Sequence, residues 1–165
     1  MSGFAPSWLA LREPFDRSAR NEAAPTLGLP AFAARLRARR GHGAPLQVLD
    51  LGCGAGANLR ALAPALGGTQ HWRLVDHDSR LLATLPDALR NWAAAQGWRA
   101  VDTAQGLAID GQQGLALAIA WQQADLAQDA QGLRLAGVDL VTASALLDLV
   151  SAQWLGRWVE VCRMA

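Results

Sequence analysis

Residues Leu46 to Asn58 read Leu-Gln-Val-Leu-Asp-Leu-Gly-Cys-Gly-Ala-Gly-Ala-Asn, and this stretch decides the fold of the 165-residue chain. The short apolar run from Val48 to Leu51 is typical of a buried strand in a parallel sheet. Glycines then occupy alternate positions, and the leucines that follow are spaced along one helix face: Gly52, Gly54 and Gly56, then Leu59, Leu62 and Leu66. The stretch therefore predicts a strand, a glycine turn and a helix, in that order.

The glycine turn has the chemistry of a ligand site. Glycine tolerates positive φ and has no side chain, so its backbone can approach a ligand closely. The helix that follows directs free N–H groups at the same place. Asp50 ends the strand at the edge where open α/β sheets bind ligands, and it could orient the turn or attract a cationic group. A carboxylate at this position is poorly placed to receive a pyrophosphate.

The run Asp50-Leu-Gly-Cys-Gly-Ala-Gly resembles the first motif of class I S-adenosylmethionine-dependent methyltransferases. The resemblance implies that the turn holds the methionine part of S-adenosyl-L-methionine. The cofactor-binding residues that it implies here are Asp50, Gly52, Cys53, Gly54 and Asn58. The same glycines, with Ala57, also fit the dinucleotide fingerprint G-x-G-x-x-A, so an NAD-dependent oxidoreductase is the first alternative.

Two later acids complete the predicted site. Asp76 follows the next predicted strand, residues 71–75, at the distance at which an acid binds ribose hydroxyls in a βαβ nucleotide site, and helix capping is its alternative role. His77 is expected either near the adenine or as a partly exposed turn residue. By the resemblance, Asp125 bonds the adenine amino group and Leu126 donates its backbone N–H to the ring. The alternative for Asp125 is an ordinary acid in the turn after a strand.

Candidate substrate residues come from both ends of the chain. Ala143 is small, as a backbone that passes close to a ligand requires, and the resemblance implies that the loop after it faces the transferring methyl. Ser144 and Asp148 lie in this loop. Asp148 could orient a substrate, but complementing the start of the next helix is favoured. Near the N-terminus, Arg12 and Asp16 could line the substrate pocket or form an ion pair on the surface of a helix.

The rest of the pattern alternates helices and strands. Pro14 is expected to divide an N-terminal helical segment, residues 7–20, into two pieces. The other expected elements are helices over residues 30–40, 81–97 and 151–161, a β-hairpin of residues 106–110 and 115–121, and a fourth strand over residues 138–142. We therefore predict an N-terminal helical cap, residues 1–45, on a Rossmann-like three-layer α/β sandwich, residues 46–165. Its mostly parallel sheet is incomplete, with strand order 3-2-1-4 plus the hairpin.

Composition restricts the other function classes. The formal net charge of +1 gives no general attraction to nucleic acid, and the absence of lysine excludes a Schiff base or a catalytic ammonium group. The two cysteines do not suggest a disulfide framework, and no Cys/His cluster has the spacing of metal ligands. The sequence shows neither a signal peptide nor an apolar run long enough for a bilayer, so we expect a cytoplasmic protein without metal or membrane partners.

The function implied by the resemblance is transfer of a methyl group from S-adenosylmethionine, by in-line displacement, to a small-molecule or protein nucleophile. No catalytic residue can be named from the sequence. The family's sheet has seven strands, of which the last three are missing here, so later residues or another chain would complete it. This incompleteness leaves a third alternative, a catalytically inactive methyltransferase-like module for binding or assembly.

Overall fold

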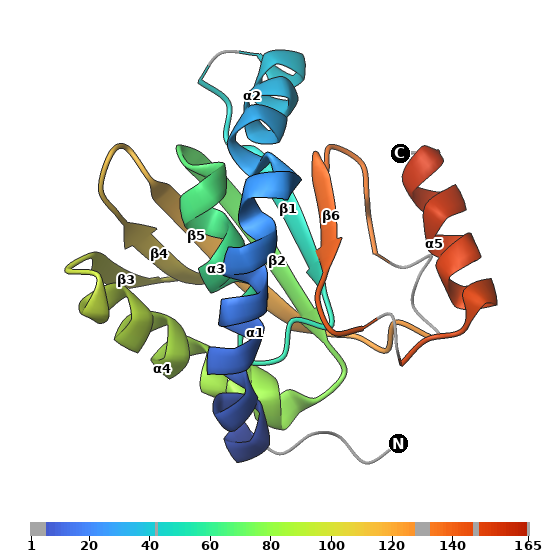
Figure 1. Ribbon diagram of the computed structural model, residues 1–165, viewed down its shortest axis with the longest axis horizontal. Helices are drawn as coiled ribbons and strands as arrows, with labels where there is room; N and C mark the ends of the chain where they lie inside the picture. The colour runs from blue at the N-terminus through green and yellow to red at the C-terminus, as the bar shows by residue number, and fades with distance from the viewer. Residues whose placement is uncertain (1–5, 42, 128–132, 147–148, 165) are drawn as a thin grey trace.

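The protein is described by a computed structural model that covers residues 6–41, 43–127, 133–146 and 149–164. Within these residues two helices precede the first strand, β1 and β2 are each followed by a helix, and four strands then precede a C-terminal helix (Figure 1). In chain order the elements are α1 (Pro6–Leu27), α2 (Leu29–Arg40), β1 (Leu46–Leu51), α3 (Ala57–Leu66), β2 (Thr69–Asp76), α4 (Ser79–Ala95), β3 (Arg99–Thr103), β4 (Gly106–Asp110), β5 (Ala116–Gln123), β6 (Leu140–Ala143) and α5 (Ala152–Arg163).

The described strands form one mixed sheet in the order β3-β4-β5-β2-β1-β6. Strands β5, β2, β1 and β6 pair in parallel, whereas β3 pairs with β4, and β4 with β5, in antiparallel fashion. The second arm of the predicted hairpin is β5 and serves as the third strand of the predicted order, and the predicted fourth strand is β6, so the order 3-2-1-4 is confirmed. The predicted hairpin is also confirmed and consists of β4 and β5. The chain therefore has a Rossmann-like α/β fold with an open sheet.

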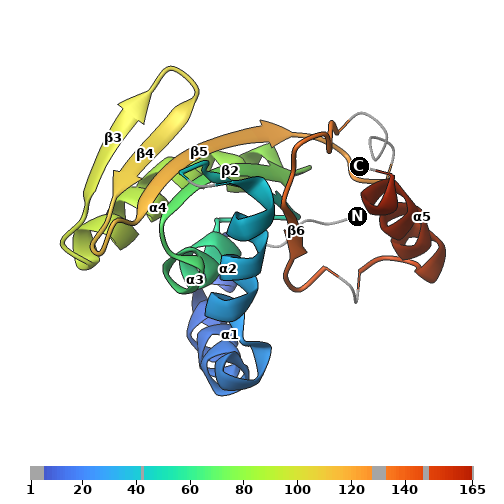
Figure 2. The ribbon, with the colours of Figure 1, turned by 90° about the horizontal axis from the view of Figure 1, so that it is seen from above.

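Side chains of alternate strand residues build two apolar cores on opposite faces of the sheet. Trp72 of β2 lies in the larger core, which packs against α3 and α4. Leu49, Leu51 and Val75 lie in the smaller core, together with Trp158 of α5. Figure 2 shows α1 to α4 on one side of the sheet and α5 beyond β6. The second face is therefore covered at its β1 and β6 end.

Polar residues at the helix starts explain where two of the helices begin. The side chain of Asp78 accepts a hydrogen bond from the backbone N–H of Arg80 at the start of α4. In the same way, Ser151 accepts from the N–H of Trp154 at the start of α5. Such side-chain caps satisfy N–H groups that have no partner within the helix. Both helices were predicted, and the cap of α4, for which Asp78 and Ser79 were both candidates in the sequence, is Asp78.

Two local predictions were wrong, and one strand was not predicted. Helix α1 runs without interruption through Pro14, because contacts with the rest of the protein hold it on both sides of that residue: Glu13 pairs with Arg60 of α3, and Arg20 bonds Ser144. Strand β3 was not predicted at all. Four of its five residues are exposed, so it lacks the apolar alternation that reveals a half-buried strand. The fourth strand was also placed two residues too early, since β6 begins at Leu140.

None of the described helices combines the length and apolar character that crossing a membrane requires. The division into a helical cap, residues 1–45, and a Rossmann-like domain, residues 46–165, stays a prediction. Helices α1 and α2 do contact that domain, chiefly through α3.

Candidate cofactor site at the carboxyl ends of the parallel strands

Three of the predicted acids follow neighbouring parallel strands. Asp50 lies in β1, Asp76 ends β2, and Asp125 comes two residues after β5. Since β5, β2 and β1 are adjacent and parallel, these acids lie along one edge of the sheet. The chain continues from β1 to β2 on one side and returns to β6 on the other, so a topological switch point lies between β1 and β6. Ligands of open α/β sheets bind at such a point.

Backbone hydrogen bonds fix the glycine turn against β2. The N–H of Cys53 donates to the carbonyl oxygen of Val75 at 3.0 Å, and the N–H of Gly54 donates to Oδ2 of Asp76 at 2.8 Å. The φ angles of Gly52, Gly54 and Gly56 are 65°, 53° and 79°, a region that strongly favours glycine. The turn therefore has the conformation for which its glycines were singled out.

The fully buried side chain of Asp50 connects β1 to α3 and, through Asn58, to β6. Its Oδ1 accepts a hydrogen bond of 2.7 Å from Nδ2 of Asn58, which also donates to Oγ1 of Thr142 at 3.1 Å. Its Oδ2 has no hydrogen-bond partner among the described residues. Burial raises the pKa of Asp50 to about 7; the Asn58 hydrogen bond and the charge of Arg20 oppose this shift, and the charge of Asp76 adds to it. Of the two predicted roles, orienting the turn is the one visible here, because Asn58 lies in the first turn of the helix that follows it.

Cys53 is a buried residue of the turn rather than a nucleophile. Burial, aided by the charges of Asp50 and Asp76, raises the pKa of its thiol. Since the thiolate is the reactive form, the thiol stays inert. A small side chain that fits the turn is what this position requires.

Asp76 holds the turn that follows its own strand as well as the glycine turn. Its Oδ1 accepts from the N–H of Asp78 at 2.9 Å, while its Oδ2 accepts from Gly54. A carboxylate oxygen can accept two hydrogen bonds, so each oxygen retains acceptor capacity for a hydroxyl. Nδ1 of His77 lies 3.4 Å from Oδ1 of Asp76, and the His77 side chain is 61% exposed. His77 is thus an exposed turn residue beside the predicted ribose site.

The loop after β5 lies next to Asp76 and is held by α5. The N–H of Ala124 donates to the carbonyl oxygen of Asp76 at 3.0 Å. Asp125 is exposed, and its Oδ1 accepts from the N–H of Ala127 at 2.9 Å. The carbonyl oxygen of Leu126 accepts from Nε1 of Trp154 at 2.9 Å. Asp125 therefore has the turn geometry that was its alternative role, and its contact with an adenine ring stays a prediction.

The segment after β6 forms the other side of the switch point. Ala143 ends β6, lies opposite Leu51 in the parallel register, and is exposed. The next residue, Ser144, accepts a hydrogen bond of 2.6 Å from Nη2 of Arg20. Leu146 contacts the glycine turn closely, since a Cβ atom on Gly52 would lie 3.1 Å from its Cδ1. Asp148 is outside the described residues.

Arg12 and Asp16 form an ion pair on α1. Nε of Arg12 lies 3.2 Å from Oδ1 of Asp16, and the Arg12 side chain is 48% exposed. This is the helix-surface pair that was one of their two expected roles, and a substrate-binding role for them stays a prediction. The residue of α1 that does reach the sheet edge is Arg20, which the sequence did not reveal because Ser144 lies 124 positions away.

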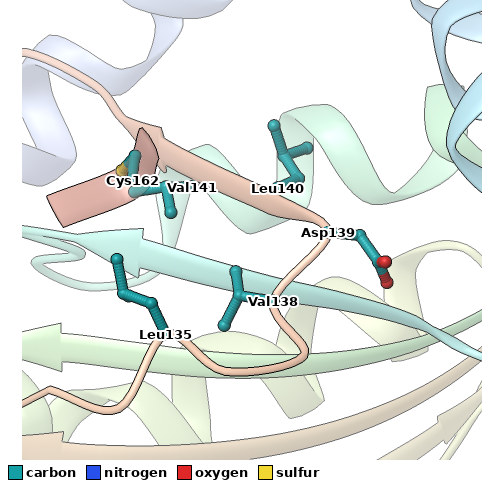
Figure 3. Close-up of a pocket in the computed structure, with 6 residues that line it drawn as sticks. All are labelled: Leu135, Val138, Asp139, Leu140, Val141 and Cys162. Atoms are coloured by element: carbon teal, nitrogen blue, oxygen red, sulfur yellow. The ribbon is translucent and has the colours of Figure 1, made fainter. Parts of the chain in front are cut away.

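Two well-formed cavities in the described part of the chain lie away from this edge. One, of about 240 Å³, is lined by Leu135, Val138, Asp139, Leu140, Val141 and Cys162 between β6 and α5 (Figure 3). The other, of about 400 Å³, is lined by residues near the end of α2 and the start of β2. Neither includes a predicted cofactor-binding residue.

No family model matches this sequence, and no curated protein matches it. Among solved structures, the chain is similar to a crystal structure of an S-adenosylmethionine-dependent methyltransferase from Mesorhizobium loti, with 24% sequence identity and a TM-score of 0.43. The match covers 82% of this chain and 50% of that one. The chain thus spans about half the length of the protein that it matches.

Proposed function

We propose that the chain binds S-adenosyl-L-methionine at the carboxyl edge of its parallel strands and belongs to a methyltransferase. The observation that carries this proposal is the hydrogen bond from the Gly54 N–H to the Asp76 carboxylate. In a turn that binds pyrophosphate, such N–H groups point at the phosphate oxygens. Here an anionic side chain already takes that donor, and a second acid, Asp50, lies behind the turn. This arrangement favours a cationic ligand with a ribose diol over the pyrophosphate of NAD.

The residues along this edge fit the parts of the cofactor. Asp76 retains the acceptor capacity that two ribose hydroxyls require. The exposed Asp125 and the partly buried Leu126 lie one strand further along, where an adenine ring would follow the ribose. The glycine turn and the segment after Ala143 flank the switch point, where the methionine part would lie. When bound, S-adenosylmethionine supplies an activated methyl group.

The task that remains for this chain is to position the ligand and exclude water. Ala143 and Ser144 stand at the side of the switch point from which an acceptor would approach. The proposed reaction is in-line transfer of the methyl group to a small-molecule or protein nucleophile. No general base is assigned, since an amine or enolate nucleophile can react without one.

Replacing Asp76 tests the proposed ribose contact. We expect Asp76→Ala to weaken the binding of S-adenosylhomocysteine by on the order of 1–3 kcal/mol, because charge-assisted hydrogen bonds to the ribose are lost. Isothermal titration calorimetry measures the dissociation constant, and Asp110→Ala, at an exposed acid of β4, is the matched control.

An unchanged dissociation constant for Asp76→Ala would remove this residue from the site. Titration of the unaltered protein with NADH tests the main alternative. Tighter binding of NADH than of S-adenosylhomocysteine would reverse the proposal in favour of an oxidoreductase. Binding of S-adenosylhomocysteine without methyl transfer by the complete gene product would favour an inactive binding module.

A further inference from the structure

Arg20 is a charged residue that α1 brings to the switch point. Its Nη2 donates to Oγ of Ser144 at 2.6 Å, which places the guanidinium beside the segment that leaves β6. Its charge also acts on the Asp50 carboxylate at the end of β1. Arg20 therefore lies across the gap between β1 and β6, where the fold directs a ligand.

The guanidinium of Arg20 has no carboxylate within ion-pair distance among the described residues, although its charge acts on Asp50. Arg60, the other arginine near the glycine turn, forms an ion pair of 2.6 Å with Glu13. Arg20 forms no ion pair with any residue in the described ranges, and its bond to Ser144 uses one of five N–H donors. The planar fork of arginine matches a carboxylate in bidentate geometry, so the remaining donors suit an anionic group of a ligand.

Arg20 and Asp50 together carry two opposite charges on either side of the same point. The α-amino-acid end of S-adenosylmethionine carries an ammonium and a carboxylate group. The ammonium is attracted by the Asp50 and Asp76 carboxylates, and the carboxylate by the Arg20 guanidinium.

We propose that Arg20 of the N-terminal helix binds the α-carboxylate of the cofactor's amino-acid part, and that Ser144 positions the guanidinium for this contact. This inference rests on the proposed function of the site. It assigns α1 a direct part in ligand recognition and explains why a helix before the first strand reaches the segment after β6.

A thermodynamic cycle on the full chain tests the contact. The probes are S-adenosylhomocysteine and its decarboxylated analogue, which retains the amine and the nucleoside, and the variant is Arg20→Gln. We expect the variant to bind S-adenosylhomocysteine about 10- to 100-fold more weakly and the decarboxylated analogue with nearly unchanged affinity. Arg39→Gln, at an exposed arginine of α2, is the matched control and leaves both affinities unchanged.

Two further variants keep the test decisive. Arg20→Lys retains the positive charge but not the planar fork of donors, so it should lose less affinity for S-adenosylhomocysteine than Arg20→Gln does. If Arg20→Gln fails to fold, the comparison of the two probes is made with Arg20→Lys. Ser144→Ala lowers affinity for S-adenosylhomocysteine by less than Arg20→Gln does, because the guanidinium itself remains.

The outcomes separate this inference from the proposed function. If the unaltered protein binds S-adenosylhomocysteine and Arg20→Gln weakens both probes equally, or neither, Arg20 does not bind the carboxylate and the inference alone is overturned. If the unaltered protein binds neither probe, the proposed function is overturned as well.

Discussion

We expect the substitution Gly54→Val to weaken the binding of S-adenosylhomocysteine by about 100-fold or more. The φ angle of Gly54 is 53°, and a β-branched residue is strongly disfavoured there. The turn must therefore rearrange, and the Gly54 N–H then leaves the Asp76 carboxylate that it contacts at 2.8 Å. The added side chain also enters the space in which the backbone would approach the ligand. Calorimetric titration measures the loss.

Gly97→Val separates backbone strain from loss of the site. Gly97 has a φ of 70° and follows α4, and a Cβ atom there would meet nothing within 4 Å. Both variants are expected to lower the midpoint of thermal unfolding, but Gly97→Val retains ligand affinity. If Gly54→Val also retained it, the glycine turn would not meet the ligand, and the cofactor site would have to lie elsewhere.

The stability of the folded chain is expected to fall as the pH rises from about 4 to about 7, through the ionisation of Asp50. Burial raises the pKa of Asp50 from 3.8 to about 7. In this interval the folded protein keeps the proton while the unfolded chain has lost it, so the free energy of unfolding decreases with pH and levels off above the folded pKa. The contribution of Asp50 across the interval is about 4 kcal/mol at most.

Urea unfolding at a series of pH values, for the unaltered protein and for Asp50→Asn, measures this contribution. The asparagine cannot ionise, so the decrease between pH 4 and 7 should be absent in the variant, whereas Asp110→Asn at the exposed end of β4 should retain it. Arg80 lowers the pKa of Asp78 to about 2, and that group therefore acts only in more acidic solution. Parallel profiles for Asp50→Asn and the unaltered protein would contradict the assignment.

The order of the parallel strands could be predicted because the buried strands have short apolar runs and two of the helices, α4 and α5, begin at capping residues. Asp78 and Ser151 mark helix starts by local chemistry, which a sequence displays directly. The continuity of α1 through Pro14 could not be predicted, because the contacts that hold it come from α3 and from the segment after β6. Strand β3 was not predicted because it is a mostly exposed edge strand. Its pairing with β4, rather than its own composition, makes it a strand.

The parts of the candidate site that could be predicted are those marked by neighbouring residues in the sequence. The glycine spacing fixed the turn, and the positions of Asp76 and Asp125 after successive strands placed them along one edge. The hydrogen bond between Asp76 and Gly54 spans 22 residues and depends on how the two strands pair, so no sequence pattern reveals it. Thr142 and Arg20 were missed for the same reason: each meets its partner only after the sheet has formed.

Arg60 binds two parts of the molecule with one side chain. Its guanidinium contacts the Glu13 carboxylate of α1 and the carbonyl oxygen of Ala55 in the glycine turn, and the side chain is only 11% exposed. A truncated protein that begins at Leu29 would therefore lack Glu13 and leave the largely buried guanidinium of Arg60 without its counter-ion. Such a truncation should speed amide hydrogen exchange around residues 54–56, which makes the N-terminal helix an unsafe place to trim for crystallisation or expression.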